Sequence, residues 1–364
     1  MNISDIDSNF KQNCLANCPY DIEWHDVCSD NFAMHGIFYS KKDDGFLRLP
    51  KDIANSVSEN VGRLCKHTAG GRLRIRTDSP VIAYQVTLKY VGLMVHMPLT
   101  GQMGFGFYTD NKFEGSFTPT YDQVNDRTGD VIYTCNFHHT IYPKKKGEFY
   151  DYDLYFPLYN PVTALTIGFP KGSKFEKPRE YKHKTPILYY GSSITQGGCA
   201  GHPGNEYQGH LSRELDTDYI NLGFSGSAKG EPAMCDYITS LPHSVFVMDY
   251  DHNAPNAQHL QDTHYAFYKR YREKCKDTPI IFATRPDCWY RKEEKQRVAI
   301  IKNTYKKALE DGDKNVYFIQ GKNFFGKDKF SCTIDSVHPN DLGFYKMAKA
   351  FYPILKKLLD SKKD

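Results

Sequence analysis

The chain has 364 residues, enough for two domains that each bury a core. Charged residues make up 25% and hydrophobic residues 40%, which is typical of a globular protein that folds in water. The net charge is only +4 and the basic residues are dispersed, so the composition argues against a nucleic-acid-binding protein. No apolar run approaches the length that a bilayer requires, and we expect no membrane partner.

The N-terminal residues 1–7 lack the basic and apolar regions of a signal peptide, and none of the ten cysteines forms a Cys-x-x-Cys pair. Cys14 and Cys18 are four residues apart, with no second pair to complete a metal set. We therefore expect free thiols in a cytoplasmic protein. His138 and His139 would point to opposite faces of a strand, so we expect no metal site and no cofactor.

Residues 1–175 show short β-type stretches separated by turn residues. The first clear one runs from Arg72 to Thr77, where apolar and basic residues alternate as in a strand with one buried face. The predicted strands cover residues 72–77, 81–88, 104–108, 131–134, 152–156 and 164–167. No convincing helix pattern separates them, so we predict an all-β sandwich, jelly-roll-like in type. The segment 170–180 is the predicted linker.

Residues 176–364 alternate apolar strands with amphipathic helices. We predict strands at 187–190, 218–222, 244–250, 279–283 and 315–319, and helices at 205–214, 229–240, 257–276, 292–311 and 342–359. This alternation predicts a three-layer α/β/α domain with a parallel sheet. Reacting groups in such domains gather at the carboxyl ends of the strands.

Two motifs at these strand ends carry the chemistry. Gly191-Ser192-Ser193-Ile194-Thr195 follows the first predicted strand, and Asp335-Ser336-Val337-His338-Pro339 precedes the last helix. A serine hydroxyl becomes nucleophilic when an imidazole takes its proton and a carboxylate holds the imidazole in the right tautomer. Ser193, His338 and Asp335 are therefore the predicted nucleophile, base and orienter. The ordinary alternative is a Gly-Ser turn with a surface histidine and a capping aspartate.

Acyl transfer also needs donors for the negatively charged oxygen of the tetrahedral intermediate. Gly226 follows the second strand and could aim its backbone N–H at the site, whereas Asn253 follows the third and could offer its carboxamide. The N–H of Ser193, at the start of a helix, is the third predicted donor. Ser192 is predicted to cap that helix. A turn glycine and a helix-capping asparagine are the competing interpretations of Gly226 and Asn253.

These blocks, in this order, resemble the SGNH (GDSL-type) hydrolase family over about residues 187–350. The positions that match the family's catalytic and oxyanion residues are Ser193, Gly226, Asn253, Asp335 and His338. Ser192 stands where the family name has aspartate, and the third block, Asp251-His252-Asn253-Ala254, does not end in aspartate. The resemblance implies a three-layer serine esterase that works through an acyl-enzyme on Ser193.

The first half is similar to the β-domain that precedes the catalytic domain in one bacterial subgroup of this family. The similarity lies in Thr77-Asp78-Ser79-Pro80, in Gly104–Tyr108, where Gly106 replaces a typical aspartate, and in Leu154–Asn160. Two-domain enzymes of this kind include carbohydrate O-acetylesterases acting on hemicellulose oligosaccharides, mannan among them. The resemblance thus implies removal of O-acetyl groups from acetylated mannan or xylan oligosaccharides.

The candidate substrate contacts lie in loops at the same end of the predicted sheet. They are His252, Asp251, Trp289, Arg285 and His202. An indole at the mouth of a site is a good platform for a sugar ring, but Trp289 could equally pack between domains. Two other functions stay under consideration: a lipase or thioesterase for longer acyl esters, and a carbohydrate-binding protein with a degenerate hydrolase domain. The sequence does not decide whether the protein is a homo-oligomer.

Overall fold

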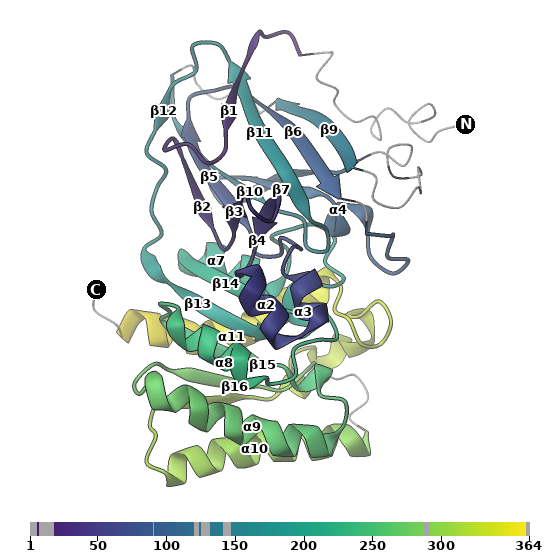
Figure 1. The fold of residues 1–364 in the computed structure, drawn as a ribbon, viewed down its shortest axis with the longest axis vertical. Helices are drawn as coiled ribbons and strands as arrows, with labels where there is room; N and C mark the ends of the chain where they lie inside the picture. Colours follow the sequence, from purple (N-terminus) through teal and green to yellow (C-terminus); the bar gives the residue numbers. More distant parts are fainter. Residues whose placement is uncertain are drawn as a thin grey trace.

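The computed structural model of the chain describes residues 6, 18–89, 91–119, 124, 132–140, 147–286 and 291–361. Its two parts are stacked along the long axis of the molecule (Figure 1). Antiparallel sheets form one part, and a parallel sheet flanked by helices forms the other. In the described part of the chain, no helix is long and apolar enough to cross a membrane.

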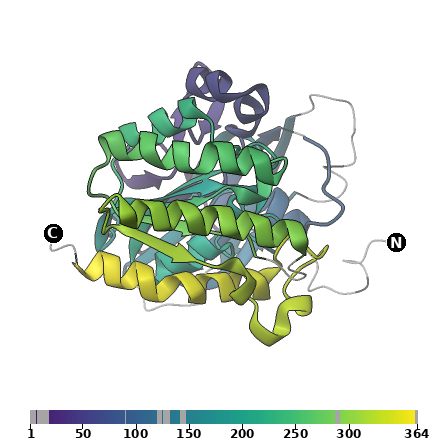
Figure 2. The same cartoon turned by 90° about the horizontal axis from the view of Figure 1, so that it is seen from below.

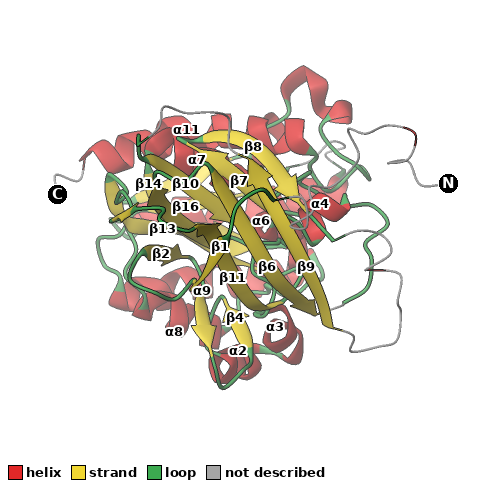
Figure 3. Ribbon diagram, turned by 90° about the horizontal axis from the view of Figure 1, so that it is seen from above, coloured by secondary structure: helices red, strands yellow, loops and turns green. Residues whose placement is uncertain are grey.

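Two antiparallel sheets pack against each other in the first part, as the view from above shows (Figure 3). One sheet has the order β1 (Ile22–Asp26), β11 (Val162–Pro170), β6 (Val81–Lys89) and β9 (Ile132–Thr140). The other has the order β12 (Phe175–Glu176), β5 (Arg72–Thr77), β10 (Tyr150–Tyr155), β7 (Phe105–Thr109) and β8 (Lys112–Phe117), with β2 (Phe32–His35) also paired to β5. A small hairpin joins β3 (Phe38–Ser40) to β4 (Gly45–Leu47). Alternate apolar residues of these strands fill the space between the sheets, which confirms the predicted N-terminal β part.

Three short helices correct the prediction of an all-β first half. They are α2 (Lys51–Val57), α3 (Glu59–Leu64) and α4 (Leu99–Gln102). Ser58 lies between α2 and α3, and its hydroxyl caps α3 by accepting from the Val61 N–H at 3.2 Å. The buried faces of α2 and α3 pack against the second part of the chain. Their apolar residues therefore belong to the core of that part and not to the core of the β-sandwich. The predicted linker is also partly a strand, because β12 pairs with β5.

The second part contains a five-stranded sheet in which every neighbouring pair is parallel, as predicted. Its order is β14 (Thr217–Gly223), β13 (His183–Gly191), β15 (Val245–Asp249), β16 (Ile280–Ala283) and β17 (Val316–Ile319). The first strand, β13, thus lies inside the sheet, with the second on one side and the third on the other. The strand order reverses at β13, and ligands of open α/β sheets bind at such a point.

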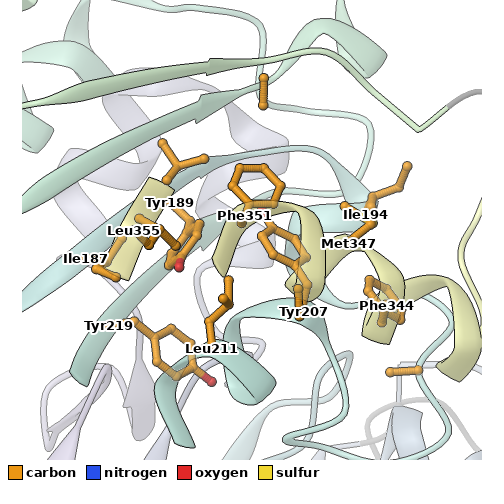
Figure 4. Packing of buried hydrophobic residues seen from close by; sticks show 14 of the residues in the cluster. Ile187, Tyr189, Ile194, Tyr207, Leu211, Tyr219, Phe344, Met347, Phe351 and Leu355 are labelled. Atoms are coloured by element: carbon orange, nitrogen blue, oxygen red, sulfur yellow. The ribbon is translucent and has the colours of Figure 1, made fainter. Parts of the chain in front are cut away.

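Helices cover both faces of this sheet (Figure 2). One face packs on α7 (Tyr207–Leu215) and α11 (Asp341–Ser361), the other on α8 (Pro232–Ser240), α9 (Ala257–Lys274) and α10 (Lys292–Glu310). Successive residues of β13 alternate between the two layers: Ile187 and Tyr189 face α7 and α11 (Figure 4), whereas Leu188 and Tyr190 face the other side. The helices α2 and α3 join this second layer.

A buried ion pair joins the two parts of the chain. The Arg72 guanidinium, on β5, is fully buried, pairs with the Asp218 carboxylate on β14, and lies 3.7 Å from the centre of the Tyr219 ring. His35 Nδ1 lies 2.9 Å from the second oxygen of Asp218. Burial opposes the charge of Asp218, but the His35 hydrogen bond and the Arg72 charge outweigh it and lower the pKa of this carboxyl.

We expect Asp218→Asn to lower the free energy of unfolding at pH 7 by about 3 kcal/mol, because it leaves the buried Arg72 charge without its partner. The pKa of Asp218 is lower in the folded than in the unfolded protein. Its contribution is therefore complete above the unfolded pKa, about 3.9, and disappears as the pH falls through the folded pKa. Urea titrations at pH 7 and pH 3 should show a large difference between variant and parent at pH 7 and a smaller one at pH 3.

The matched control is Asp311→Asn, which removes an exposed ion pair with Lys269. Screening by solvent makes such a pair weak, so this variant should unfold almost as the parent does. Equal urea midpoints for Asp218→Asn and the parent would contradict the importance of the buried pair.

Candidate active site

Ser193 is the first residue of a short helix, α6 (Ser193–Gln196), that begins directly after β13. The Ser192 hydroxyl caps this helix by accepting from the Ile194 N–H at 3.2 Å. The Ile194 side chain packs into the core beside α11 (Figure 4). Gly223 on β14 permits this close approach, since a Cβ at that position would lie 2.2 Å from the Gln196 nitrogen. The nucleophile candidate is thereby held at the carboxyl end of β13, inside the sheet.

The structure brings Ser193, His338 and Asp335 together. Ser193 Oγ lies 2.9 Å from His338 Nε2, and His338 Nδ1 lies 2.7 Å from Asp335 Oδ2. The backbone N–H groups of Val337 and His338 donate to the other oxygen of Asp335 at 3.0 and 2.7 Å. Burial opposes ionisation of Asp335, but these hydrogen bonds and the His338 side chain lower its pKa. An ionised Asp335 accepts a hydrogen bond from the Nδ1–H group of His338, which leaves Nε2 free to take the serine proton.

Two hydrogen bonds, each donated by a backbone N–H group, hold the serine and histidine loops together. The Cys199 N–H donates to the Pro339 carbonyl at 3.3 Å, and the Gly201 N–H donates to Asp341 Oδ1 at 2.7 Å. Asp341 is the first residue of α11, so the start of this helix is fixed against the loop that follows α6. Hydrogen bonds therefore fix the segment that carries His338 against the loop that follows Ser193.

The other two predicted oxyanion residues, Gly226 and Asn253, lie on loops that contact each other. Gly226 has φ +66°, and a Cβ there would meet nothing within 4 Å, so glycine serves the backbone conformation and not a lack of space. Asn253 Nδ2 donates to the Phe224 carbonyl at 2.8 Å. The Ser225 N–H donates to Gln196 Oε1 at 3.0 Å, which ties the Gly226 loop to α6.

Arg48, which the sequence analysis missed, supports this loop from the N-terminal half. Its guanidinium is buried, donates to the carbonyls of Gly223 at 2.5 Å and Leu64 at 2.7 Å, and lies 4.5 Å from the centre of the Phe224 ring. Burial lowers its pKa to about 10, so it stays charged at neutral pH. Within the described residues no carboxylate pairs with it, so a buried positive charge lies next to the predicted oxyanion loop.

Asp249 is a second residue that the sequence analysis missed. It ends β15 and is buried, with its Oδ2 accepting from Thr195 Oγ1 at 3.2 Å and from the Tyr207 hydroxyl at 3.3 Å. Burial, and next the charge of Asp251, raise the pKa of Asp249 well above its usual range. This environment favours the neutral form of Asp249, which anchors the helix of the nucleophile. Its position in an apolar strand gave no sign of this role.

Three of the predicted substrate contacts lie beside the triad. The His252 ring is centred 6.3 Å from that of His338, and its Nδ1 lies 3.1 Å from Arg285 Nη1. Burial lowers the pKa of His252 to about 3, so the ring is neutral and accepts from Arg285. Asp251 is almost completely buried and accepts twice from the Arg285 backbone N–H, at 3.1 and 3.2 Å. Its carboxylate therefore supports the loop, and its contact with a substrate stays a prediction.

A hollow of about 230 Å³, lined mainly by residues with polar side chains, opens next to these residues. It is lined by His252, Arg285, Pro286, Arg291, Glu294, Asp335, Ser336 and Val337. Arg285 Nη2 donates to Glu294 at 2.5 Å, so the hollow contains a paired charge. Charged and hydroxyl groups in such a place can bind a hydroxyl-rich molecule.

Two further predicted substrate contacts, His202 and Trp289, remain to be placed. His202 stacks on Phe113 of β8, with ring centres 3.8 Å apart, and lines a different hollow of about 530 Å³. Trp289 lies outside the described residues. His96, in the loop between β6 and α4, was not predicted, yet its ring is centred 5.7 Å from that of His338. No local motif marks a histidine that comes from the other half of the chain.

Comparison with known proteins gives a family for each half. Residues 184–356 match the GDSL-like lipase/acylhydrolase family, and residues 22–175 match the N-terminus of SGNH hydrolase-type esterases. No curated protein gave a significant match in sequence.

Solved structures share the architecture of the whole chain. A protein from Bacteroides ovatus ATCC 8483 described as a GDSL-like lipase is 26% identical, with a TM-score of 0.81, covering 93% of this chain and 98% of its own. The salicylyl-acyltransferase SsfX3 of a tetracycline biosynthetic pathway is 17% identical, with a TM-score of 0.75 and coverage of 93% and 97%. The acetyl xylan esterase Est2A of the rumen bacterium Butyrivibrio proteoclasticus is 12% identical, with a TM-score of 0.60 and coverage of 94% and 100%. At these identities the last two show a common fold.

The order of the motifs, the geometry of the triad and the family matches agree. Through residues 184–356 the chain belongs to the GDSL-like lipase/acylhydrolase family, and it is a two-domain carboxylic ester hydrolase of the SGNH type.

Proposed function

We propose that this enzyme removes O-acetyl groups from hemicellulose oligosaccharides, mannan or xylan, through an acyl-enzyme on Ser193. The observation that carries the proposal is the continuous hydrogen-bonded chain from Ser193 Oγ to His338 and on to Asp335, at 2.9 and 2.7 Å. This arrangement can activate a hydroxyl for attack on an ester carbonyl.

In the proposed reaction, Ser193 Oγ attacks the acetyl carbonyl while His338 Nε2 takes its proton. The N–H groups of Ser193 and Gly226 and the Asn253 carboxamide stabilise the oxyanion. His338 then protonates the departing sugar oxygen, which leaves Ser193 acetylated. Water enters, gives its proton to His338 and attacks the acetyl carbon, and acetate leaves as the serine regains its proton.

The polar hollow beside the triad supports a sugar as the leaving group. Arg285, Glu294 and Ser336 line it and offer hydrogen-bond donors and acceptors, which suit hydroxyl groups more than an alkyl chain. The acetyl xylan esterase with the same fold is consistent with this substrate class. The neutral His252 ring, centred 6.3 Å from His338, is the proposed contact for the sugar nearest the ester.

Ser193→Ala should reduce kcat on 4-nitrophenyl acetate by about a million-fold, because the nucleophile is lost while the fold is kept. A stopped assay at high enzyme concentration measures the residual rate, and a fluorophosphonate probe should label the parent and not the variant. The control, Ser56→Ala, removes an exposed hydroxyl on α2 and should change neither result. Turnover near the parent rate in Ser193→Ala would overturn the assignment. Absence of labelling in an inactive parent would instead favour a degenerate, carbohydrate-binding protein.

Asn253→Ala should lower kcat by about 10²- to 10³-fold with little change in KM, since an oxyanion donor acts mainly in the transition state. Steady-state kinetics on the same ester separate the two constants. Asn60→Ala, on the exposed surface of α3, is the matched control. A change in KM alone would show that Asn253 contacts the substrate in the ground state and is not an oxyanion donor.

The parent should prefer acetate over octanoate esters in kcat/KM, because the acyl group of the proposed substrate is acetyl. Hydrolysis rates along a series of 4-nitrophenyl esters measure the acyl preference. Mass spectrometry of acetylated mannan and xylan oligosaccharides after incubation should show successive losses of acetyl groups. A preference for octanoate would favour a lipase or thioesterase in place of a carbohydrate esterase.

A further inference from the structure

Three metal-ligating side chains from three distant segments meet at the triad. The candidate ligand atoms of His96, Cys199 and His338 all lie within 4.8 Å of one another. Cys199 is buried, and the two imidazoles are partly exposed. The His96 ring and the Cys199 thiol have no hydrogen-bond partner within the described part of the chain, so both can take a new ligand.

The segments that carry His96 and Cys199 are fixed to each other. Thr100 Oγ1 donates to the Gly201 carbonyl at 2.5 Å, which joins the α4 segment to the Cys199 loop. Gln102 is buried and holds the loop of His96 from inside: it accepts from the Met94 N–H at 2.9 Å and donates to the Gly92 carbonyl at 2.6 Å. The cluster is therefore supported by the structure around it and does not rest on three flexible surface side chains.

The donor set selects one class of ion. Two imidazole nitrogens and one thiolate suit Zn²⁺ and similar thiophilic divalent cations. Zinc binds imidazole nitrogen at about 2.0–2.1 Å and thiolate sulfur at about 2.3 Å, so the three atoms would have to close by about 1 Å. Asp335 already accepts from His338 Nδ1 at 2.7 Å, which is the carboxylate–histidine support that zinc ligands have in proteins.

We propose that His96, Cys199 and His338 Nε2 form an inhibitory site for a thiophilic divalent cation. The Cys199 thiol gives its proton to solvent on binding, and the thiolate and the two imidazoles donate electron pairs to the ion. Because Nε2 uses the same electron pair for the metal and for the Ser193 proton, a bound ion removes the base. The ion is an inhibitor of the ester hydrolysis proposed above and takes no part in it.

Zinc titration of ester hydrolysis tests the inhibition. We expect the parent to lose more than ten-fold in rate with zinc and to recover it with EDTA. His96→Ala and Cys199→Ser should keep their activity in EDTA and need at least ten-fold more zinc for half inhibition. His183→Ala, at the start of β13, and Cys275→Ser, after α9, are controls that should respond as the parent does. Equal zinc sensitivity in all variants would overturn the site.

A second measurement does not depend on catalysis. Co²⁺ bound in Ser193→Ala should give a thiolate-to-metal charge-transfer absorption in the near ultraviolet, which is absent in the Ser193→Ala/Cys199→Ser double variant. The spectrum needs no substrate, so it separates failure of this site from failure of the proposed esterase function. Absence of the band in Ser193→Ala would overturn the metal site even if zinc inhibited the parent.

Discussion

The active site depends on one spatial constraint: the loop before α11 must return from the edge of the sheet to the middle, where β13 presents Ser193. The Cys199–Pro339 and Gly201–Asp341 hydrogen bonds fix this return, at 3.3 and 2.7 Å. Because they act on the residues next to His338, they determine the position of the imidazole more directly than the distant core packing of α11. The 2.9 Å contact between the serine oxygen and Nε2 is the result.

The pKa values of two carboxyl groups near this point are displaced in opposite directions, and their surroundings explain the difference. Asp335 is partly exposed and accepts hydrogen bonds that favour its charge, whereas Asp249 is buried and accepts only two hydroxyl groups. An ionised Asp335 can orient His338. A neutral Asp249 can support the nucleophile helix without adding a second negative charge where the oxyanion forms. The buried Arg48 guanidinium adds a fixed positive charge on the side of the Gly226 loop.

The parts of this site that are local in sequence could be predicted. An apolar strand followed by Gly-Ser-Ser, and an Asp-x-x-His before a helix, each carry their own signal. They predict that Ser193 and His338 lie at the carboxyl ends of the strands, and in the structure the two side chains are in contact. Contributions from the N-terminal half carry no such signal. Arg48 and His96 are single residues in ordinary segments, and only the packing of the two halves brings them to the site. The α2 and α3 helices were missed for a related reason, since their apolar faces fit the core of the other half.

Base catalysis and metal binding make the same demands on a histidine. Each requires a neutral ring, a free electron pair on one nitrogen and a carboxylate on the other, and Asp335 supplies that carboxylate to His338 at 2.7 Å. What separates the two outcomes is the number of further donors nearby. With only a serine hydroxyl nearby, the imidazole activates a nucleophile. A thiol and a second imidazole within 4.8 Å give a metal ion enough ligands to compete with the serine proton for the electron pair of His338. His96 belongs to the N-terminal half, so the packing of the two halves also determines whether the catalytic base can be blocked by a metal.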